Sequence, residues 1–126
     1  MPPAVTVVIP TFERPDHLHA ALESVAGQDY EGDTKAIIVD GSKEATAEEV
    51  VQEFSFAEYL WQFDHVPNQE TKIANIAVAR DLAVSFAESE YIHFLDDDDT
   101  LTPSAISKKI QAVQNNPLAN GAYSAV

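Results

Sequence analysis

Short β-rich apolar runs alternate with helical segments along the whole chain, and this alternation limits the folds open to it. The runs occupy residues 4–9, 34–39, 59–63 and 91–95, and residues 121–126 have the composition of a further strand. Strands that are joined through helices pair in parallel, and both faces of such a sheet are covered. We therefore expect an α/β fold with a mostly parallel sheet covered by helices, in a single domain over residues 1–126.

Two helices are expected in the first half of the chain. Pro15 suits the first turn of a helix, which Gly27 ends. The apolar residues between them recur with the helical period, at Leu18, Ala21, Leu22 and Val25. Further on, T-A-E-E at residues 46–49 fits a capping box and predicts a short helix through Phe54.

The second half carries two more helical patterns. A polar loop is predicted at residues 66–71, followed by a long helix over residues 72–87. The expected buried face of this helix consists of Ile73, Ile76, Ala77, Arg80, Val84 and Ala87. Thr102 before Pro103 predicts the N-cap and first residue of a last helix. Its expected apolar face consists of Ile106, Ile110 and Val113.

Four consecutive aspartates, residues 96–99, follow directly on the run at residues 91–95. We expect this run to be a short buried strand, with the aspartates in the loop at its carboxyl end, where open α/β sheets bind ligands. If the chain leaves the strand still extended, Asp96 and Asp98 point to one side and Asp97 and Asp99 to the other. Because hard cations such as Mg²⁺ and Mn²⁺ take oxygen ligands, this pattern favours a metal or phosphate site over a solvated acidic turn.

The chain is strongly acidic, with 7 Lys and Arg against 21 Asp and Glu and a net charge of −14. This balance argues against nucleic acid polymers and anionic membrane surfaces as partners, because both attract basic proteins. Since salt screens self-repulsion, the composition favours adaptation to a saline environment. We see no signal peptide and no apolar run long enough to span a membrane, so we expect a cytoplasmic protein, or one peripheral at the inner membrane face.

Three motifs in this order resemble those of family 2 inverting nucleotide-sugar glycosyltransferases. They are V-T-V-V-I-P-T-F-E-R at residues 5–14, I-I-V-D-G-S at residues 37–42, and A-R-D at residues 79–81 followed by E-Y-I-H-F-L-D-D-D-D at residues 90–99. The resemblance implies the Rossmann-like GT-A fold and transfer of a sugar from a nucleotide-diphosphate donor, such as a UDP-sugar. It also implies a divalent metal cofactor, Mn²⁺ or Mg²⁺. The acceptor, which is a saccharide, a lipid or a protein, is not identified by the sequence.

The resemblance also implies roles for individual residues. The nucleotide-binding residues it implies are Pro10, Thr11, Glu13, Asp40, Arg80 and Asp96, and the implied metal ligands are Asp96 and Asp98. Some of these positions have ordinary alternatives: Asp40 before glycine is a good turn former, and Glu13 is a plausible surface charge. Arg80 either forms a structural salt bridge, for instance to the aspartate loop, or lies near the diphosphate. The family usually has two acidic residues before Gly-Ser, so either Val39 or Asp40 occupies the base-reading position.

The catalytic base of the family is an Asp or Glu well beyond the D-x-D motif. We therefore expect the base past Val126, and the chain to be the donor-binding half of the domain, truncated after the D-x-D half. One alternative is a nucleotide-binding fragment without turnover. Another is a phosphatase of the haloacid dehalogenase type, because residues 94–100 fit hydrophobic-D-x-D-x-T with Asp96 as nucleophile and Asp98 as general acid. That family carries the motif on its first strand, whereas about four-fifths of this chain precedes it.

Overall fold

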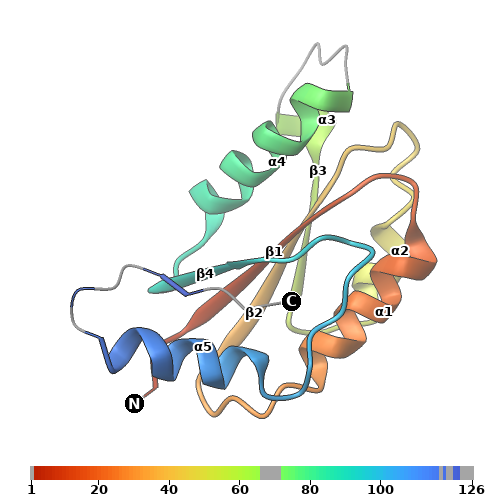
Figure 1. The fold of residues 1–126 in the computed structure, drawn as a ribbon. Coiled ribbons are helices and arrows are strands. Elements are labelled where there is room, and N and C mark those ends of the chain that lie inside the picture. The colour runs from red at the N-terminus through yellow and green to blue at the C-terminus, as the bar shows by residue number, and fades with distance from the viewer. Residues whose placement is uncertain (1, 66–71, 117, 119–120, 123–126) are drawn as a thin grey trace.

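The computed structural model describes residues 2–65, 72–116, 118 and 121–122. These residues contain four strands, which form one parallel sheet in the order β3-β2-β1-β4 (Figure 1). The strands are β1 (Val5–Thr11), β2 (Thr34–Asp40), β3 (Ala57–Trp61) and β4 (Tyr91–Phe94). The α/β fold with a largely parallel sheet is thus confirmed. Because all four strands run the same way, their carboxyl ends lie at one edge.

Helices cover both faces of the sheet, as expected (Figure 1). One face carries α1 (Pro15–Ala26), α2 (Glu48–Gln52) and α5 (Ala105–Gln114), and the other carries α4 (Lys72–Phe86). A single turn, α3 (Gln62–His65), follows β3 directly. Among the described helices, none has the length and apolar character needed to cross a membrane.

The larger hydrophobic cluster joins alternate residues of β1 and β2 to α1. Strand side chains alternate between the two faces, so Val7 and Ile9 point to the same side as Ala36 and Ile38. The predicted face of α1 is confirmed, because its buried residues are Leu18, Ala21, Leu22 and Val25. Full burial of each aliphatic side chain of this size contributes about 1.5–3 kcal/mol. This cluster therefore fixes the end of β1 and the start of α1, between which the first loop runs.

The buried face of α4 differs from the predicted one. Ala79 and Ala83 are buried against the sheet, whereas Ile76 and Val84 are 54% and 43% exposed. The prediction failed because α4 is apolar on most sides, so the helical period does not single out one face. The alanines let the helix lie close to large strand side chains, which are Val8, Ile37, Val39 and Leu60. The side chain of Ile73 lies outside the described part of the chain.

β1 continues through Pro10 to Thr11, although Pro10 was expected to close it. Val8 accepts a hydrogen bond from the Leu95 N–H, and Pro10 faces the same side two residues later. The pairing with β4 ends at Phe94 opposite Val8, so the missing N–H of Pro10 breaks no ladder bond. The strand therefore carries Thr11 into the same edge as Asp40, its partner in register on β2.

The predicted capping box at residues 46–49 is wrong. The N-cap of α2 is Ala47, whose N–H donates to the Asp40 carboxylate at 3.1 Å, while the Thr46 hydroxyl donates to Ser42 Oγ at 3.2 Å. A carboxylate from β2 thus takes the place of a local side-chain cap. The local pattern did not predict this because the partner lies seven residues earlier in the chain.

α5 begins at Ala105, with Ser104 rather than Thr102 as its N-cap. The side chain of Gln28 replaces the predicted cap, because its Oε1 accepts from the Ile106 N–H at 3.0 Å. The predicted face is confirmed at Ile106 and Ile110, which are buried.

β4 was expected to be buried, but it is an edge strand of the described sheet, and Phe94 is 48% exposed. The polar loop predicted at residues 66–71 lies outside the described residues, and so do residues 123–126 of the strand predicted over residues 121–126. Residues 121–122 are described and are not in a strand.

Candidate functional site at the carboxyl edge of the sheet

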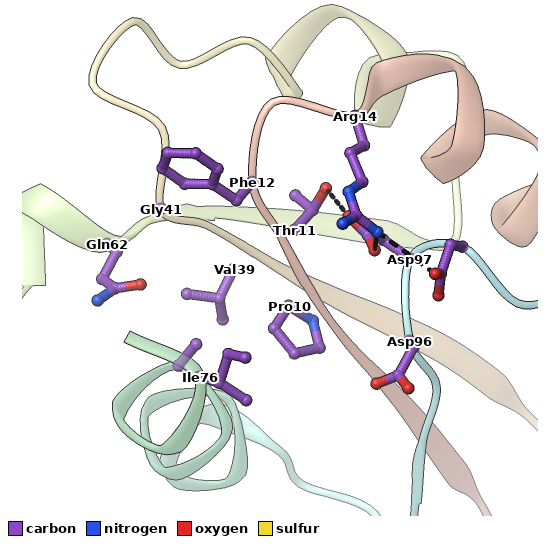
Figure 2. A pocket seen from close by; sticks show the side chains of 12 residues that line it. Pro10, Thr11, Phe12, Arg14, Val39, Gly41, Gln62, Ile76, Asp96 and Asp97 are labelled. Atoms are coloured by element: carbon purple, nitrogen blue, oxygen red, sulfur yellow. Dashed lines mark hydrogen bonds and ion pairs between the residues drawn. The ribbon is translucent and has the colours of Figure 1, made fainter. Parts of the chain in front are cut away.

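A cavity of about 430 Å³ opens at the carboxyl edge of the sheet, between α4 and the aspartate turn (Figure 2). One wall is mostly apolar and comes from the strand ends, α3 and α4. The opposite wall is charged and comes from the first loop and the aspartate turn. The lining residues are Pro10, Thr11, Phe12, Arg14, Val39, Gly41, Gln62, Ile76, Ala79, Asp96, Asp97 and Asp98. The cavity thus combines an apolar surface with carboxylates and a guanidinium.

The four aspartates do not continue as an extended strand, because the chain turns there. The Asp99 N–H donates to the Asp96 carbonyl at 3.1 Å. The turn brings together carboxylate oxygens of Asp96, Asp98 and Asp99, all within 4.8 Å of one another and all on exposed side chains. Asp96 and Asp98 do lie together as expected, but Asp99 joins them instead of facing away with Asp97.

Asp97 points back into the protein and ties the aspartate turn to β1. It is 8% exposed and accepts a hydrogen bond from the Thr11 hydroxyl at 2.9 Å. Arg14 Nη1 lies 3.5 Å from Asp97 Oδ1 and 3.3 Å from Asp98 Oδ2 (Figure 2). The first loop and the aspartate turn, more than eighty residues apart in sequence, are therefore held together by one hydroxyl and one guanidinium.

Arg80 brings a second guanidinium to the turn from α4. Its Nη2 donates to Asp96 Oδ1 at 3.4 Å, and its guanidinium carbon lies 5.6 Å from the centre of the Phe94 ring. Its Nε is buried and has no hydrogen-bond partner among the described residues. The salt bridge to the aspartate turn, one of the two alternatives for Arg80, is thus present. Its role near a diphosphate stays a prediction.

Asp40 stands at the end of β2 but does not line the cavity. It is fully buried, and its carboxylate accepts three hydrogen bonds, from the Ser42 N–H at 2.9 Å, the Ala47 N–H at 3.1 Å and the Tyr59 hydroxyl at 2.7 Å. Burial first, and then the hydrogen bond to Asp40, raise the pKa of Tyr59 well above its ordinary value, so its hydroxyl stays a donor. The carboxylate is committed to holding the turn between β2 and α2. Its binding of a nucleotide base stays a prediction.

Of the predicted nucleotide-binding residues, the structure brings Pro10, Thr11 and Asp96 to the cavity wall. Glu13 is exposed and lies outside the lining set, in a loop conformation with φ of 53°. Sequence reasoning gave no role to Arg14 or to the inward-facing Asp97.

Other lining residues were missed as well: Phe12, Gln62 and Ile76. The sequence offered one signal for Phe12, Arg14 and Asp97, which is that each lies within a motif that carries the family resemblance, at residues 5–14 or 90–99. The presence of Gln62 and Ile76 at the cavity depends on how α3 and α4 meet the strands.

The donor set of the aspartate turn fits a hard divalent cation. Three exposed carboxylates each offer one oxygen within the same small region, and Mg²⁺ and Mn²⁺ prefer such ligands. Mg²⁺ typically retains waters and shares its site with substrate phosphates, which suits a cluster at the mouth of a cavity. Asp96 and Asp98 are therefore suitable ligands, as predicted, and Asp99 is a third that the extended-chain argument had placed on the other side.

Comparison with known families adds a sequence-wide match. The model of the family described as "Glycosyl transferase family 2" matches residues 6–124. Among curated relatives, CgeD of Bacillus subtilis is 28% identical over 123 residues, which cover 95% of this chain and 28% of CgeD. An uncharacterized glycosyltransferase of Methanocaldococcus jannaschii is 28% identical over 115 residues, covering 90% of this chain and 38% of that protein. The chain thus spans well under half of the length of these relatives.

Solved structures show the same fold. TarS 1–349 of S. aureus has a TM-score of 0.68 at 20% identity, covering 82% of this chain and 30% of that one. The complex of TarS 1–349 with UDP-GlcNAc has a TM-score of 0.61 at 22% identity, covering 82% and 29%. The mannosyltransferase PcManGT of Pyrobaculum calidifontis, in complex with GDP-Man and Mn²⁺, has a TM-score of 0.62 at 19% identity, covering 79% and 29%. At these identities the likeness concerns the fold, which is that of the Rossmann-like GT-A proteins.

Proposed function

The chain belongs to glycosyl transferase family 2, and from this premise we propose that its cavity binds the nucleoside diphosphate part of a sugar donor. The proposed reaction is transfer of a sugar from that donor, for which we propose a UDP-sugar, to an acceptor. A divalent cation, Mn²⁺ or Mg²⁺, would be held by Asp96 and Asp98. Between the alternatives that the sequence left open, the family match favours a glycosyltransferase over a phosphatase.

The observation that carries this proposal is the division of the cavity into an apolar wall and a charged wall. Val39 and Ile76 form part of the apolar wall, against which a base and ribose can pack. Asp96, Asp98 and Arg14 form the charged wall, where a diphosphate and its cation can sit. A nucleoside diphosphate has the same division along its length. The cavity also lies at the carboxyl edge of a parallel sheet, which is the usual place for such ligands.

Each residue has a distinct proposed task at the charged wall. Asp96 and Asp98 offer carboxylate oxygens to the cation, and Arg80 lies beside Asp96, from where its guanidinium can face a phosphate. Thr11 fixes Asp97 and so holds the aspartate turn in place. Asp40 lies at the same edge of the sheet, outside the cavity lining, and its hydrogen bonds hold the turn between β2 and α2.

Bound at this position, a divalent cation supplies positive charge close to the leaving nucleoside diphosphate, where negative charge develops during transfer. The protein's part is to hold the donor with its diphosphate next to the aspartate turn. The guanidiniums of Arg14 and Arg80 add positive charge next to the turn. Orientation of this kind contributes about 7–11 kcal/mol in well-positioned reactions.

Two of the proteins with similar folds support the donor class, because TarS 1–349 has been crystallised with UDP-GlcNAc and PcManGT is in complex with GDP-Man and Mn²⁺. These ligands differ in base and in sugar. We therefore propose a nucleotide sugar as the donor class and place UDP first among the nucleotides to test.

Calorimetric titration with UDP, with and without Mn²⁺, tests the proposal directly. We expect measurable binding that depends on Mn²⁺, and at least about a tenfold loss of the Mn²⁺-dependent affinity in Asp98→Ala, since even indirect disturbance of metal ligands costs 10- to 100-fold. Because the chain spans 28–38% of its first curated relatives, binding is a more direct test than transfer.

The matched control is Asp33→Ala, which removes the same charge from an exposed residue just before β2, at the opposite edge of the sheet. We expect this variant to bind like the wild type. A folded wild-type protein that binds neither UDP nor GDP, with or without Mn²⁺, would refute the proposed donor site. Equal losses in Asp98→Ala and Asp33→Ala would remove the assignment of Asp98 as a metal ligand.

A further inference from the structure

We propose that Arg14 exchanges partners when the donor binds. Its guanidinium holds the Asp98 carboxylate, and on binding of cation and diphosphate it leaves Asp98 and faces the phosphates. Arg14 is then both a competitor of the cation and a binding residue for the donor. The inference rests on the proposed function, since it needs the cation at the aspartate turn.

The competition follows from the position of the Arg14 side chain. Arg14 is the residue before α1, and its Nη1 lies 3.3 Å from Asp98 Oδ2. Asp98 is also one of the three carboxylates whose oxygens lie within 4.8 Å of one another. A carboxylate oxygen that accepts a hydrogen bond from a guanidinium is less available to a cation. Cation binding at Asp98 therefore has to compete with Arg14.

The exchange is feasible because the Arg14–Asp98 pair is exposed. The side chains are 52% and 50% exposed, and exposed ion pairs shift an equilibrium by no more than about fivefold. Solvent and a divalent cation can therefore replace the guanidinium without a large penalty. The same exposure gives an incoming phosphate access to Arg14.

Asp97 is the partner that Arg14 can keep while it leaves Asp98. Its side chain is largely buried, with Oδ1 3.5 Å from Arg14 Nη1 and Oδ2 fixed by the Thr11 hydroxyl. When Arg14 gives up Asp98 it can keep Asp97. The guanidinium then remains at the wall of the cavity, which Arg14 lines.

Arg14 and Arg80 differ in how each is held. Arg80 pairs with Asp96 and also lies over the Phe94 ring, which gives its guanidinium a second, uncharged support. Both ion-pair partners of Arg14 among the described residues are aspartates of the turn. When a cation neutralises this turn, Arg14 therefore loses more of its attraction to its partners than Arg80 does. A guanidinium released in this way suits a diphosphate, since its planar fork matches phosphate oxygens.

Two affinities measured on the same variant test the exchange, first for Mn²⁺ alone and then for UDP at saturating Mn²⁺. In Arg14→Met we expect Mn²⁺ to bind about two- to fivefold tighter, because its competitor is gone. We expect UDP to bind about fivefold or more weakly, because a partner of the phosphates is gone. The two effects have opposite signs, which a merely structural role for Arg14 would not produce.

Lys35→Met is the matched control, since it removes one positive charge from an exposed residue at the amino end of β2. It reports any general effect of net charge on Mn²⁺ binding, and we expect both affinities to stay within about 1.5-fold of wild type, because surface changes away from a site are small. Arg14→Lys keeps the charge without the fork, and its Mn²⁺ affinity should stay closer to wild type than that of Arg14→Met.

The exchange is overturned if Arg14→Met, shown to be folded by its circular dichroism melt, binds Mn²⁺ no tighter than wild type does. It is equally overturned if UDP affinity at saturating Mn²⁺ does not fall. Failure of the proposed function looks different, because the wild-type protein itself would then bind no nucleotide with Mn²⁺.

Discussion

The turn after β2 and the turn after β4 both place aspartates at the carboxyl edge of the sheet, but their carboxylates have different surroundings. Asp40, after β2, is fully buried and accepts hydrogen bonds from two backbone N–H groups and the Tyr59 hydroxyl. Asp98, after β4, is 50% exposed and pairs with Arg14 alone among the interactions found for the described residues.

The two carboxylates therefore differ in how many of their acceptor sites the protein itself uses. A carboxylate has about four acceptor sites, and donors of the protein take most of them at Asp40. At Asp98 most of them face solvent. Position at the ligand-binding edge is therefore not enough, because the number of acceptor sites left unused decides whether a carboxylate can bind a cation or a ribose.

The largest effect we expect is a loss of stability in Asp40→Ala. The substitution leaves the Ser42 and Ala47 N–H groups and the Tyr59 hydroxyl without their acceptor in a buried place, and each such donor costs about 1–3 kcal/mol. We expect the free energy of unfolding to fall by at least about 3 kcal/mol, measured by urea denaturation. Asp98→Ala should stay within about 0.5 kcal/mol of wild type, as is usual for exposed sites. Similar losses in both variants would break the comparison between the two turns.

Sequence reasoning worked where local pattern and structure agree. α1 has a polar side and an apolar side, so its period identified the buried residues Leu18, Ala21, Leu22 and Val25. The four described strands were predicted because β-rich runs lie between clear turn signals, although β3 begins and ends two residues earlier than the run at residues 59–63. The clustering of aspartates after an apolar run indicated the edge of the sheet at which the cavity lies.

The sequence could not predict features that depend on distant partners. Asp97 turns inward because Thr11, 86 residues earlier, offers it a hydroxyl. The cap of α2 comes from Asp40, and that of α5 comes from Gln28, so local capping patterns were misleading. The side chains of α4 are apolar on most sides of the helix, so the sequence did not show which side is buried. Its alanines face the sheet because they leave room for the large side chains of the strands.

Tyr59→Phe tests one of the three bonds at Asp40. A hydrogen bond to a charged group contributes about 1.5–3 kcal/mol, so we expect a loss near the lower end of that range, with Mn²⁺ binding unchanged. Burial raises the pKa of Tyr59, so above pH 10 the unfolded chain releases this proton while the folded protein retains it. Stability should therefore decrease as pH rises above about 10, and less steeply in Tyr59→Phe. Equal slopes for the two proteins would show that Tyr59 does not cause the decrease.

The smallest effect we expect is a difference between the two turns in how salt changes the stability of their variants. Asp96, Asp98 and Asp99 lie close together and exposed in a protein with a net charge of −14, so their mutual repulsion acts through water and is open to screening. At low salt we expect Asp99→Asn to be more stable than wild type by about 0.5 kcal/mol or less, because one repelling charge is removed. In 1 M KCl, where the screening length is about 3 Å, this gain should vanish, while wild type itself becomes more stable.

Asp40→Asn should show the opposite pattern, a loss that persists at every salt concentration, because buried hydrogen bonds are little screened. Melting temperatures of the three proteins across KCl concentrations measure both effects. A gain in Asp99→Asn that survives molar salt would mean that its cause is not repulsion within the turn.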